Sequence, residues 1–464
     1  MDKQKLLFIP VVLLSFQAAH AAVISDIDLY KKENELSTYL RFITFDTRAH
    51  NDLIENQLGG LPTGERLGAT ALSGAVDYSS KYYGDTIGFV TSVYGVTKLD
   101  SRPDSRQILD DSDGGNDGFA EAGQAYIKLR QGGENWSADL QAGRGRFHVG
   151  TVWTLDTRAV PGSFQGARAQ VNTALPSLGP LPAELTFEAG YIDKTSPRER
   201  PEFEHIVNES GSTIDNISTY ALTYDAKAVR LQVAQGVAKD FNKNTRYELI
   251  LKAPLGDDMG VVLDNQYYYL ESDGALWGED LANGVAAYDD HAEWLNINLG
   301  FKIKKLQLGL SYSKARAELS NGQVGYAYYD HGENVDGRLD VWTRSGNDAN
   351  NDGETTWQLG VGYDFSGMKL GGLPLDGVSL LALYRQGSFD APNPINGGAE
   401  EEVTERHREV RLSYYFEEKD YKGLSVGVMY VDYSMNKDFV PLVSAQPNSV
   451  LSGTDFRVYA DYAF

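Results

Sequence analysis

The stretch 456–464, which reads FRVYADYAF, alternates strictly between an apolar and a more polar face. Phe456 and Phe464 lie on the apolar face with every second residue between them, while Arg457 and Asp461 lie on the other. A period of two is the side-chain period of a β-strand. A strand that is apolar on one side and wet on the other is typical of the wall of a transmembrane β-barrel.

The same alternation recurs along the whole chain in segments of roughly ten residues. The polar faces hold Gln, Asn and Gly, which suit a wet lumen. The strands predicted in this way are 36–46, 68–80, 86–97, 119–130, 136–143, 166–174, 183–192, 217–226, 229–233, 246–252, 261–271, 295–303, 306–312, 357–365, 378–389, 409–416, 424–430 and 456–464. The sequence therefore predicts an all-β, antiparallel transmembrane barrel of about eighteen strands, within the even-numbered range of bacterial barrels.

The connections between these strands differ in length, as the two ends of a barrel require. Short joints at 225–228, 304–305 and 417–422 contrast with long polar stretches at 99–118, 144–165, 193–216, 272–290, 314–354 and 389–404. A soluble β-sandwich would also alternate, but about eighteen strands exceed ordinary sheet dimensions. The barrel is the preferred interpretation.

Residues 1–21 are typical of a secretory signal peptide. Lys3 and Lys5 precede an apolar run from Leu6 to Phe16, and Ala19-His20-Ala21 fits a cleavage site. We therefore expect residues 22–464 to form one barrel domain in the outer membrane of a Gram-negative bacterium. Phe464 is typical of the last strand that the barrel-assembly machinery reads, so that machinery is an expected partner.

The composition excludes some classes of binding partner and favours others. A formal net charge of −23 makes nucleic acid an unsuitable ligand. No cysteine is present, so disulfide support is excluded. The 28 tyrosines are spread along the chain, and a tyrosine ring suits the headgroup level of a membrane. We expect outer-membrane lipids and lipopolysaccharide around the barrel.

A basic segment stands out between 144 and 168. Arg144, Arg146, His148, Arg158 and Arg168 occur there with only Asp156 opposing them. The segment is too long to be one strand, so it either folds inward and narrows the pore or forms an exposed loop whose arginines pair with local acids. Trp153 and Phe164 could offer a stacking face to sugars, and the arginines a track for carboxylates.

Two patches resemble a known family. Ala142-Gly143 followed by 161–167, and 337–342 followed by 350–354, resemble segments of OprD-type porins, particularly of their chitoporin branch. The resemblance implies an eighteen-stranded, substrate-selective barrel with an inward third loop and a basic track on its wall. It also implies a constriction that includes Arg144, Arg146, Asp156 and Arg158, to which we add Phe164. Thr343 stands where the chitoporins carry a second aromatic residue.

The inward positions of the predicted strands carry nearly balanced charge. The basic ones are Arg41, Arg230, Arg246, Lys252, Lys302, Arg411 and Arg457, and the acidic ones are Asp139, Glu184, Glu188, Glu248, Asp264, Asp364, Glu409 and Asp461. Selectivity is therefore expected at the basic loop rather than on this wall.

Two acidic loops resemble calcium ligand sets. Asp348, Asn350 and Asp352 alternate before Gly353, and a second acidic run covers 110–117. Hard oxygen ligands at alternate positions suit calcium, although solvated acidic loops are common. Structural calcium at Asp348, Asn350 and Asp352 is a hypothesis, and no other cofactor is expected.

Nothing in the sequence indicates an enzyme. Asp330 and His331 are adjacent, and adjacent strand residues point to opposite faces. The histidines lack metal-ligand spacing. We expect a porin for passive diffusion of small hydrophilic solutes, with chitooligosaccharides or other sugars first and small carboxylates or amino acids as the alternative. A non-transporting barrel, an adhesin or an outer-membrane enzyme, is the rival class. The oligomeric state is expected to be a monomer or a loose trimer.

Overall fold

The computed structural model describes residues 32–49, 66–101, 108, 117–175, 183–256, 258–342, 348–393, 397–416, 421–436 and 453–464. The expected signal peptide at 1–21 lies outside these residues, as does the acidic run at 110–116. All statements below concern the described part of the chain.

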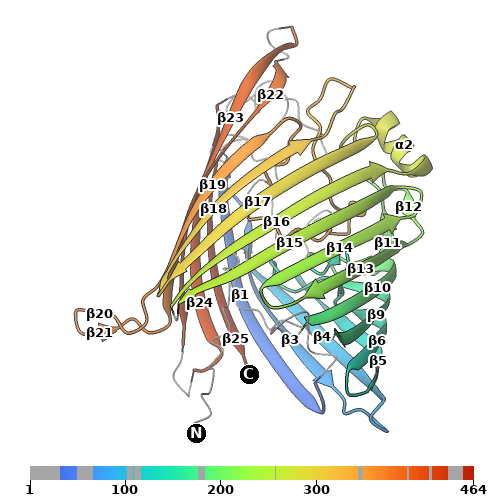
Figure 1. Ribbon diagram of the computed structural model, residues 1–464, viewed down its shortest axis with the longest axis vertical. Coiled ribbons are helices and arrows are strands. Elements are labelled where there is room, and N and C mark those ends of the chain that lie inside the picture. The colour runs from blue at the N-terminus through green and yellow to red at the C-terminus, as the bar shows by residue number, and fades with distance from the viewer. Residues whose placement is uncertain are drawn as a thin grey trace.

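Eighteen long strands form one closed antiparallel barrel (Figure 1). They are β1 (Glu35–Ala49), β3 (Ala69–Ser79), β4 (Ile87–Ser101), β5 (Gly118–Gly132), β6 (Trp136–Gly145), β9 (Ser163–Leu175), β10 (Ala183–Ser196), β13 (Ile217–Asp225), β14 (Val229–Ala238), β15 (Asn242–Gly256), β16 (Met259–Ser272), β17 (His291–Ile303), β18 (Leu306–Arg316), β19 (Thr355–Asp364), β22 (Val378–Asn393), β23 (Ala399–Tyr415), β24 (Leu424–Met435) and β25 (Gly453–Ala463). Each pairs with the next, and β25 closes on β1 from Tyr39↔Ala463 to Ala49↔Gly453. The predicted strands and their order are confirmed.

Short elements occupy the connections. They are β2 (Arg66–Leu67), β7 (His148–Val149), β8 (Val152–Trp153), β11 (Glu204–Val207), β12 (Thr213–Ile214), β20 (Lys369–Leu370), β21 (Leu373–Pro374) and the helix α2 (Gly274–Asn283). Within the described residues, no helix is long and apolar enough to cross a membrane.

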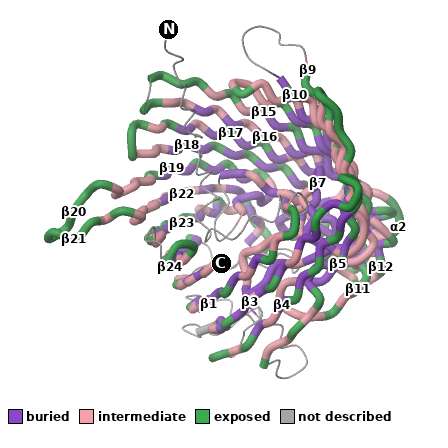
Figure 2. The backbone as a smooth tube through the Cα atoms, turned by 90° about the horizontal axis from the view of Figure 1, so that it is seen from below, coloured by how far each residue is buried: buried purple, intermediate pink, exposed green. Residues whose placement is uncertain are grey.

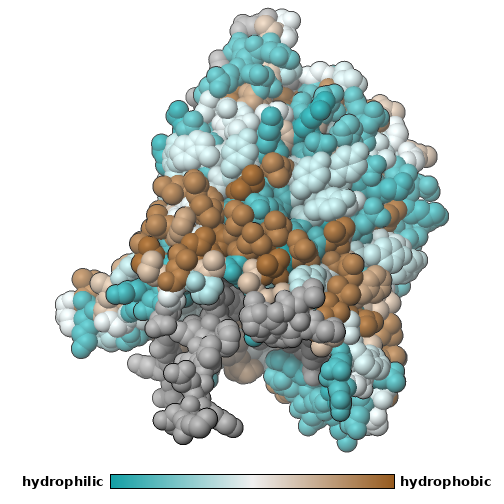
Figure 3. All heavy atoms as spheres, in the orientation of Figure 1, coloured by the Kyte–Doolittle hydropathy of each residue, from teal (hydrophilic) through white to brown (hydrophobic). Residues whose placement is uncertain are grey.

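Burial alternates along the strands as the sequence pattern predicts (Figure 2). Leu231 and Leu359 are each 47% exposed, whereas the neighbouring Gln232 is 3% exposed. The exposed apolar side chains form a band across the outer wall, visible in Figure 3. A soluble protein would bury this face, so the wall is suited to lipid.

The expectation of a long loop at 389–404 is wrong. β22 continues to Asn393 and β23 begins at Ala399, so the two strands project together beyond their neighbours (Figure 1). Proline and glycine in this stretch suggested a loop, but Phe389 and Val403 are buried against side chains of β24. Packing of this cluster offsets the poor strand propensity of the local sequence.

Candidate functional site

The 146–162 loop, between β6 and β9, folds into the barrel. Arg41, an inward residue of β1, donates from Nη1 to the carbonyl oxygens of Asp156 (2.9 Å) and Arg158 (2.6 Å). The same guanidinium forms an ion pair with the Asp156 carboxylate at 3.1 Å. Ser73 on β3 donates to a third loop carbonyl. The predicted inward folding of the basic segment is confirmed by these contacts.

The start of this loop is fixed on the other side of the lumen. The β7–β8 turn contains Gly150, whose φ is +56° and whose added Cβ would lie 2.1 Å from Oγ1 of Thr219 on β13. Only glycine fits so close an approach. The backbone N–H of Thr151 donates to that same Oγ1 at 3.0 Å. The loop therefore runs from the β13 wall to the β1 and β3 wall.

A second loop, 317–354, also enters the barrel, which the sequence did not predict. Inward amides of the wall hold its backbone: Asn244 on β15 donates to the Tyr329 carbonyl (2.8 Å), and Gln358 on β19 donates to the Trp342 carbonyl (2.6 Å). Asn242 and Gln266 donate to two further loop carbonyls. The inward Asn and Gln side chains, which the sequence pattern led us to expect in contact with water in the lumen, thus bind the backbone of a loop here.

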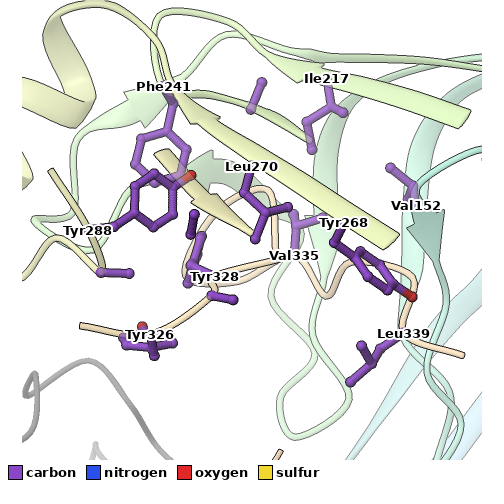
Figure 4. Close-up of a cluster of buried hydrophobic side chains, with 14 of the residues drawn as sticks. Val152, Ile217, Phe241, Tyr268, Leu270, Tyr288, Tyr326, Tyr328, Val335 and Leu339 are labelled. Carbon is purple, nitrogen blue, oxygen red and sulfur yellow. The ribbon is translucent and has the colours of Figure 1, made fainter. Parts of the chain in front are cut away.

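Apolar packing reinforces this anchoring, as Figure 4 shows. Val335 and Leu339 of the 317–354 loop belong to one buried cluster with Val152 of the 146–162 loop and Leu270 of β16. Burying one such aliphatic side chain contributes about 1.5–3 kcal/mol. Both loops are therefore part of a packed core inside one half of the barrel.

The two inward loops contact each other. Val152 and Gly337 form an isolated antiparallel bridge. The backbone N–H of Arg338 donates to the Thr151 carbonyl at 2.7 Å. Nε2 of His331 lies 2.8 Å from Oγ1 of Thr151. We take this junction of the two inward loops as the candidate site.

Basic side chains gather on one side of the site. The guanidinium groups of Arg158 and Arg457 lie over the Phe45 ring, at 5.3 and 4.1 Å from its centroid. Burial, together with the like charges of Arg198 and Arg457, lowers the pKa of Arg158 to about 10. Arg158 is still protonated at neutral pH. Glu199 lies 3.8 Å from Arg158 and 3.5 Å from Arg198. Asp336 lies 3.6 Å from Arg198, and Asp455 lies 2.6 Å from Arg457.

Asp340 supplies a negative charge in the 317–354 loop. Its Oδ2 accepts from Arg246 and from Arg338, each at 2.6 Å. Burial disfavours the charged form, but Arg338 and Arg246 lower the pKa of Asp340 to about 2. The Arg338 guanidinium also covers the Trp153 ring, 4.9 Å from its centroid. The Asp340 carboxylate thus links Arg246 on the barrel wall to Arg338 at the junction of the two loops.

The other predicted constriction residues lie nearer the wall. Arg144 at the end of β6 forms an ion pair with Glu121. Arg146 donates to the hydroxyl of Tyr94. Phe164, the second residue of β9, is 4% exposed and packs against Phe147. The structure therefore brings Asp156 and Arg158 together with the site, while the ring of Phe164 is covered.

The predicted lumen-wall residues lie on the inward faces of their strands. Each of the following pairs with an acid: Arg41 with Asp461 and Asp156, Arg230 with Glu248, Arg246 with Glu248 and Asp340, Arg411 with Glu409, and Arg457 with Asp455. Lys252 is partly buried on the face of β15 that carries Arg246. These pairs agree with a nearly balanced wall.

The proposed calcium ligands make hydrogen bonds within the protein. Asp348 accepts from the Tyr329 hydroxyl at 3.0 Å, and Asp352 accepts from the Ala317 N–H at 2.7 Å. Asn350 donates to the Ala327 carbonyl. Among the described residues, no group of three or more His, Asp or Glu side chains is placed to hold a metal ion. Calcium binding at these residues stays a prediction.

Sequence reasoning missed Arg198 and the roles of Arg338, Asp340 and His331. The segment 337–342 carries no charge or spacing pattern that predicts a site, and only its resemblance to a porin family distinguishes it. Arg198 follows β10 in a stretch rich in both charge signs. No local pattern marks such a residue, because its place in the lumen depends on where the loop turns.

Acid is expected to loosen the junction. Burial lowers the pKa of His331 and of His148 to about 3 each, against about 6.5 for an exposed imidazole. Detached loops would take up protons below about pH 6.5, whereas the folded loops do not. The stability that depends on the neutral rings is complete above about pH 6.5 and falls as the pH drops toward 3. Open-channel noise should therefore rise as the pH falls in single-channel recordings.

The variant in which both histidines are replaced by glutamine should show a weaker acid response. An identical increase of noise in the wild-type protein and in this variant would contradict the assignment.

The comparisons with known proteins agree with this architecture. Residues 32–462 match the family described as outer membrane porin, OprD family. The comparison with curated proteins by sequence gives no match. OpdK of Pseudomonas aeruginosa, solved with vanillate, is similar in structure with a TM-score of 0.69 and 18% identity, covering 92% of this chain and 98% of that chain.

Two further solved structures are comparably similar. OccAB3 of Acinetobacter baumannii has a TM-score of 0.68 and 18% identity, covering 92% of this chain and 98% of that chain. OpdQ of Pseudomonas aeruginosa has a TM-score of 0.67 and 20% identity, covering 93% and 99%.

A closed barrel with a lipid-facing wall and loops narrowing its lumen defines the class of outer-membrane channels. The chain belongs to the OprD family of outer membrane porins. It is thus an integral outer-membrane protein that passes small solutes, and the expected family and location are confirmed.

Proposed function

We propose that this porin favours small hydrophilic solutes that carry a carboxylate. The observation that carries the proposal is the set of three arginines, Arg158, Arg198 and Arg457, which lie on one side of the junction and have side chains that are 15–18% exposed. A guanidinium offers a planar pair of donors that matches a carboxylate. Solutes therefore meet guanidinium donors beside the inward loops, with Glu199, Asp336 and Asp455 as the acids that offset their charge.

A small cavity adjoins Arg198. It has a volume of about 220 Å³ and lies between the two inward loops and the segment after β10. Arg198 and Arg200 line it together with Ser196 and Asn334. The carboxylates of Glu199, Glu333 and Asp336 also line it, so the cavity's charge does not itself favour an anion, but its size suits a small solute better than an extended oligosaccharide.

The chitooligosaccharide hypothesis has less support, because a sugar needs an open ring face to stack on. Trp153 is covered by Arg338, with His148 edge-on at 4.1 Å. Phe164 and Trp342 are each 4% exposed. The aromatic rings of the segments that resemble chitoporins are therefore packed against other side chains and leave little ring surface on which a sugar could stack.

Removing the two loop charges should test the proposal. The double variant Arg158→Gln, Arg198→Gln keeps polar side chains of similar length but loses two charges. We expect the anion-to-cation permeability ratio, measured from reversal potentials in planar bilayers, to fall severalfold, and block by benzoate to weaken. Electrostatic selectivity at a narrow point follows from the charges that line it.

The matched control is Arg316→Gln, Arg408→Gln, because these two side chains are 62% and 59% exposed. This control should leave the permeability ratio unchanged. An unaltered reversal potential in the Arg158 and Arg198 variant, or stronger block of the wild-type channel by chitohexaose than by benzoate, would refute the carboxylate assignment. Association with lipopolysaccharide, recognition by the barrel-assembly machinery and a monomeric or loosely trimeric state stay predictions.

A further inference from the structure

The connection between β19 and β22 is a small hairpin made of β20 and β21. Lys369 pairs with Pro374, and Leu370 pairs with Leu373. Gly371 and Gly372 form the turn with φ of +59° and +91°. Positive φ at both central residues is typical of the tight turn that joins two antiparallel strands, and glycine adopts it without strain.

The register gives this hairpin two different faces. Directly opposed residues, and residues two apart on one strand, share a face. Met368, Leu370 and Leu373 therefore lie on one face, whereas Lys369 lies on the other with Pro374. Leu370 is 70% exposed and Leu373 is 72% exposed. These are the two largest exposures among the large hydrophobic residues that the structure describes.

Hydrogen bonds fix the hairpin to the barrel. The Leu375 N–H donates to the Met368 carbonyl at 2.9 Å, and the Gly367 N–H donates to the Asp376 carboxylate at 2.5 Å. Nζ of Lys305, in the turn between β17 and β18, donates to the Ser366 carbonyl. The apolar face is thus held in place although it contacts no other part of the described chain extensively.

The hairpin projects sideways from the barrel. Figures 1 and 2 both show β20 and β21 extending outward from the wall, away from the barrel interior. It leaves the barrel at the end that carries the Lys304-Lys305 turn. Short turns of bacterial barrels face the periplasm. The hairpin therefore lies beside the periplasmic edge of the lipid-facing wall.

We propose that this hairpin binds phospholipid of the periplasmic leaflet of the outer membrane. Its apolar face would enter the boundary of the acyl chains, continuous with the exposed wall residues Ile303 and Val361 at the same end. The ammonium group of Lys369, on the opposite face, lies at the level of the phosphates. An amphipathic element with leucines on one face and a basic residue on the other is suited to this interface.

The absence of cysteine in the chain permits an unambiguous test by single-site labelling. The variants Leu370→Cys and Lys369→Cys place a label on adjacent residues of opposite faces. Each carries an environment-sensitive fluorophore, and the full-length barrel is placed singly in nanodiscs of phosphatidylethanolamine and phosphatidylglycerol. Folding of each variant is checked by heat-modified migration in SDS gels.

We expect blue-shifted emission from the Leu370→Cys label and quenching by nitroxides on the lipid chains. The Lys369→Cys label should instead be quenched by iodide in water. Leu281→Cys on α2, at the other end of the barrel and 37% exposed, is the matched leucine control and should behave as a water-exposed site.

Two outcomes would overturn the proposal. Water-like emission from Leu370→Cys, equal to that of Leu281→Cys, would show that the hairpin does not enter lipid. Shielding of Leu370→Cys in vesicles that hold several barrels, but not in single-barrel nanodiscs, would assign the face to a second copy of this chain.

Discussion

Replacing Arg41 by alanine is expected to unfold the barrel at markedly lower temperature and to release the 146–162 loop. Arg41 is 2% exposed and binds Asp461 on β25 at 2.7 Å and Asp156 of the loop at 3.1 Å. It thus joins the closing strand pair to the loop. Removing one partner of a buried ion pair costs about 3–5 kcal/mol, because the other charge, here the Asp461 carboxylate that is 8% exposed, stays buried without its counter-charge.

The measurements are the temperature at which the folded species disappears from SDS gels and the noise of the open channel. The control is Arg408→Ala, whose ion pair with Asp432 is exposed and contributes about 0–1 kcal/mol. Arg41→Lys should recover only part of the loss, because lysine lacks the planar set of donors that reaches four oxygens at once. A quiet channel with wild-type stability in Arg41→Ala would contradict the role of this residue.

Excising the tip of the 317–354 loop is expected to raise the conductance severalfold and to lower selectivity. Tyr326 and Asn351 form an antiparallel bridge at the base of the loop, and the Ala327 N–H donates to the Asn350 carbonyl at 2.9 Å. Residues 328–349 can therefore be replaced by Asn-Gly, since a two-residue turn suits such a pair. The replacement removes the junction with the 146–162 loop from the lumen.

Its control removes the β20–β21 hairpin outside the lumen. The Leu375 N–H donates to the Met368 carbonyl, so residues 369–374 can be replaced by the same turn. We expect wild-type conductance from this control in planar bilayers. Wild-type conductance after excision of 328–349 would mean that the second loop does not narrow the path.

The two expected results concern contacts at opposite ends of the 146–162 loop. Arg41 fixes the far end of the 146–162 loop, whereas the 317–354 loop supports its near end through Thr151. Combining Arg41→Ala with the excision should therefore disorder the first loop by more than the sum of the two separate effects, since each change alone leaves the other end of the loop held.

The sequence by itself determined the barrel, its strands and their faces. Alternation is a local property: Leu231 and Gln232 point to opposite sides of a strand whatever surrounds them. A lipid-facing wall needs an apolar residue at every second position, so the sequence of each strand by itself indicates which face meets lipid. The arginines also marked the basic segment, but the sequence left open whether that segment folds inward or forms an exposed loop.

Only the tertiary structure decided where the loops go and which charges meet. His331 and Thr151 are far apart in sequence, and inward amides such as Asn244 have the same periodicity whether they contact water or a loop backbone. The contacts that place Asp340 between Arg246 and Arg338 depend on the path of the whole 317–354 loop. Long-range packing has no period, so no local pattern predicts it.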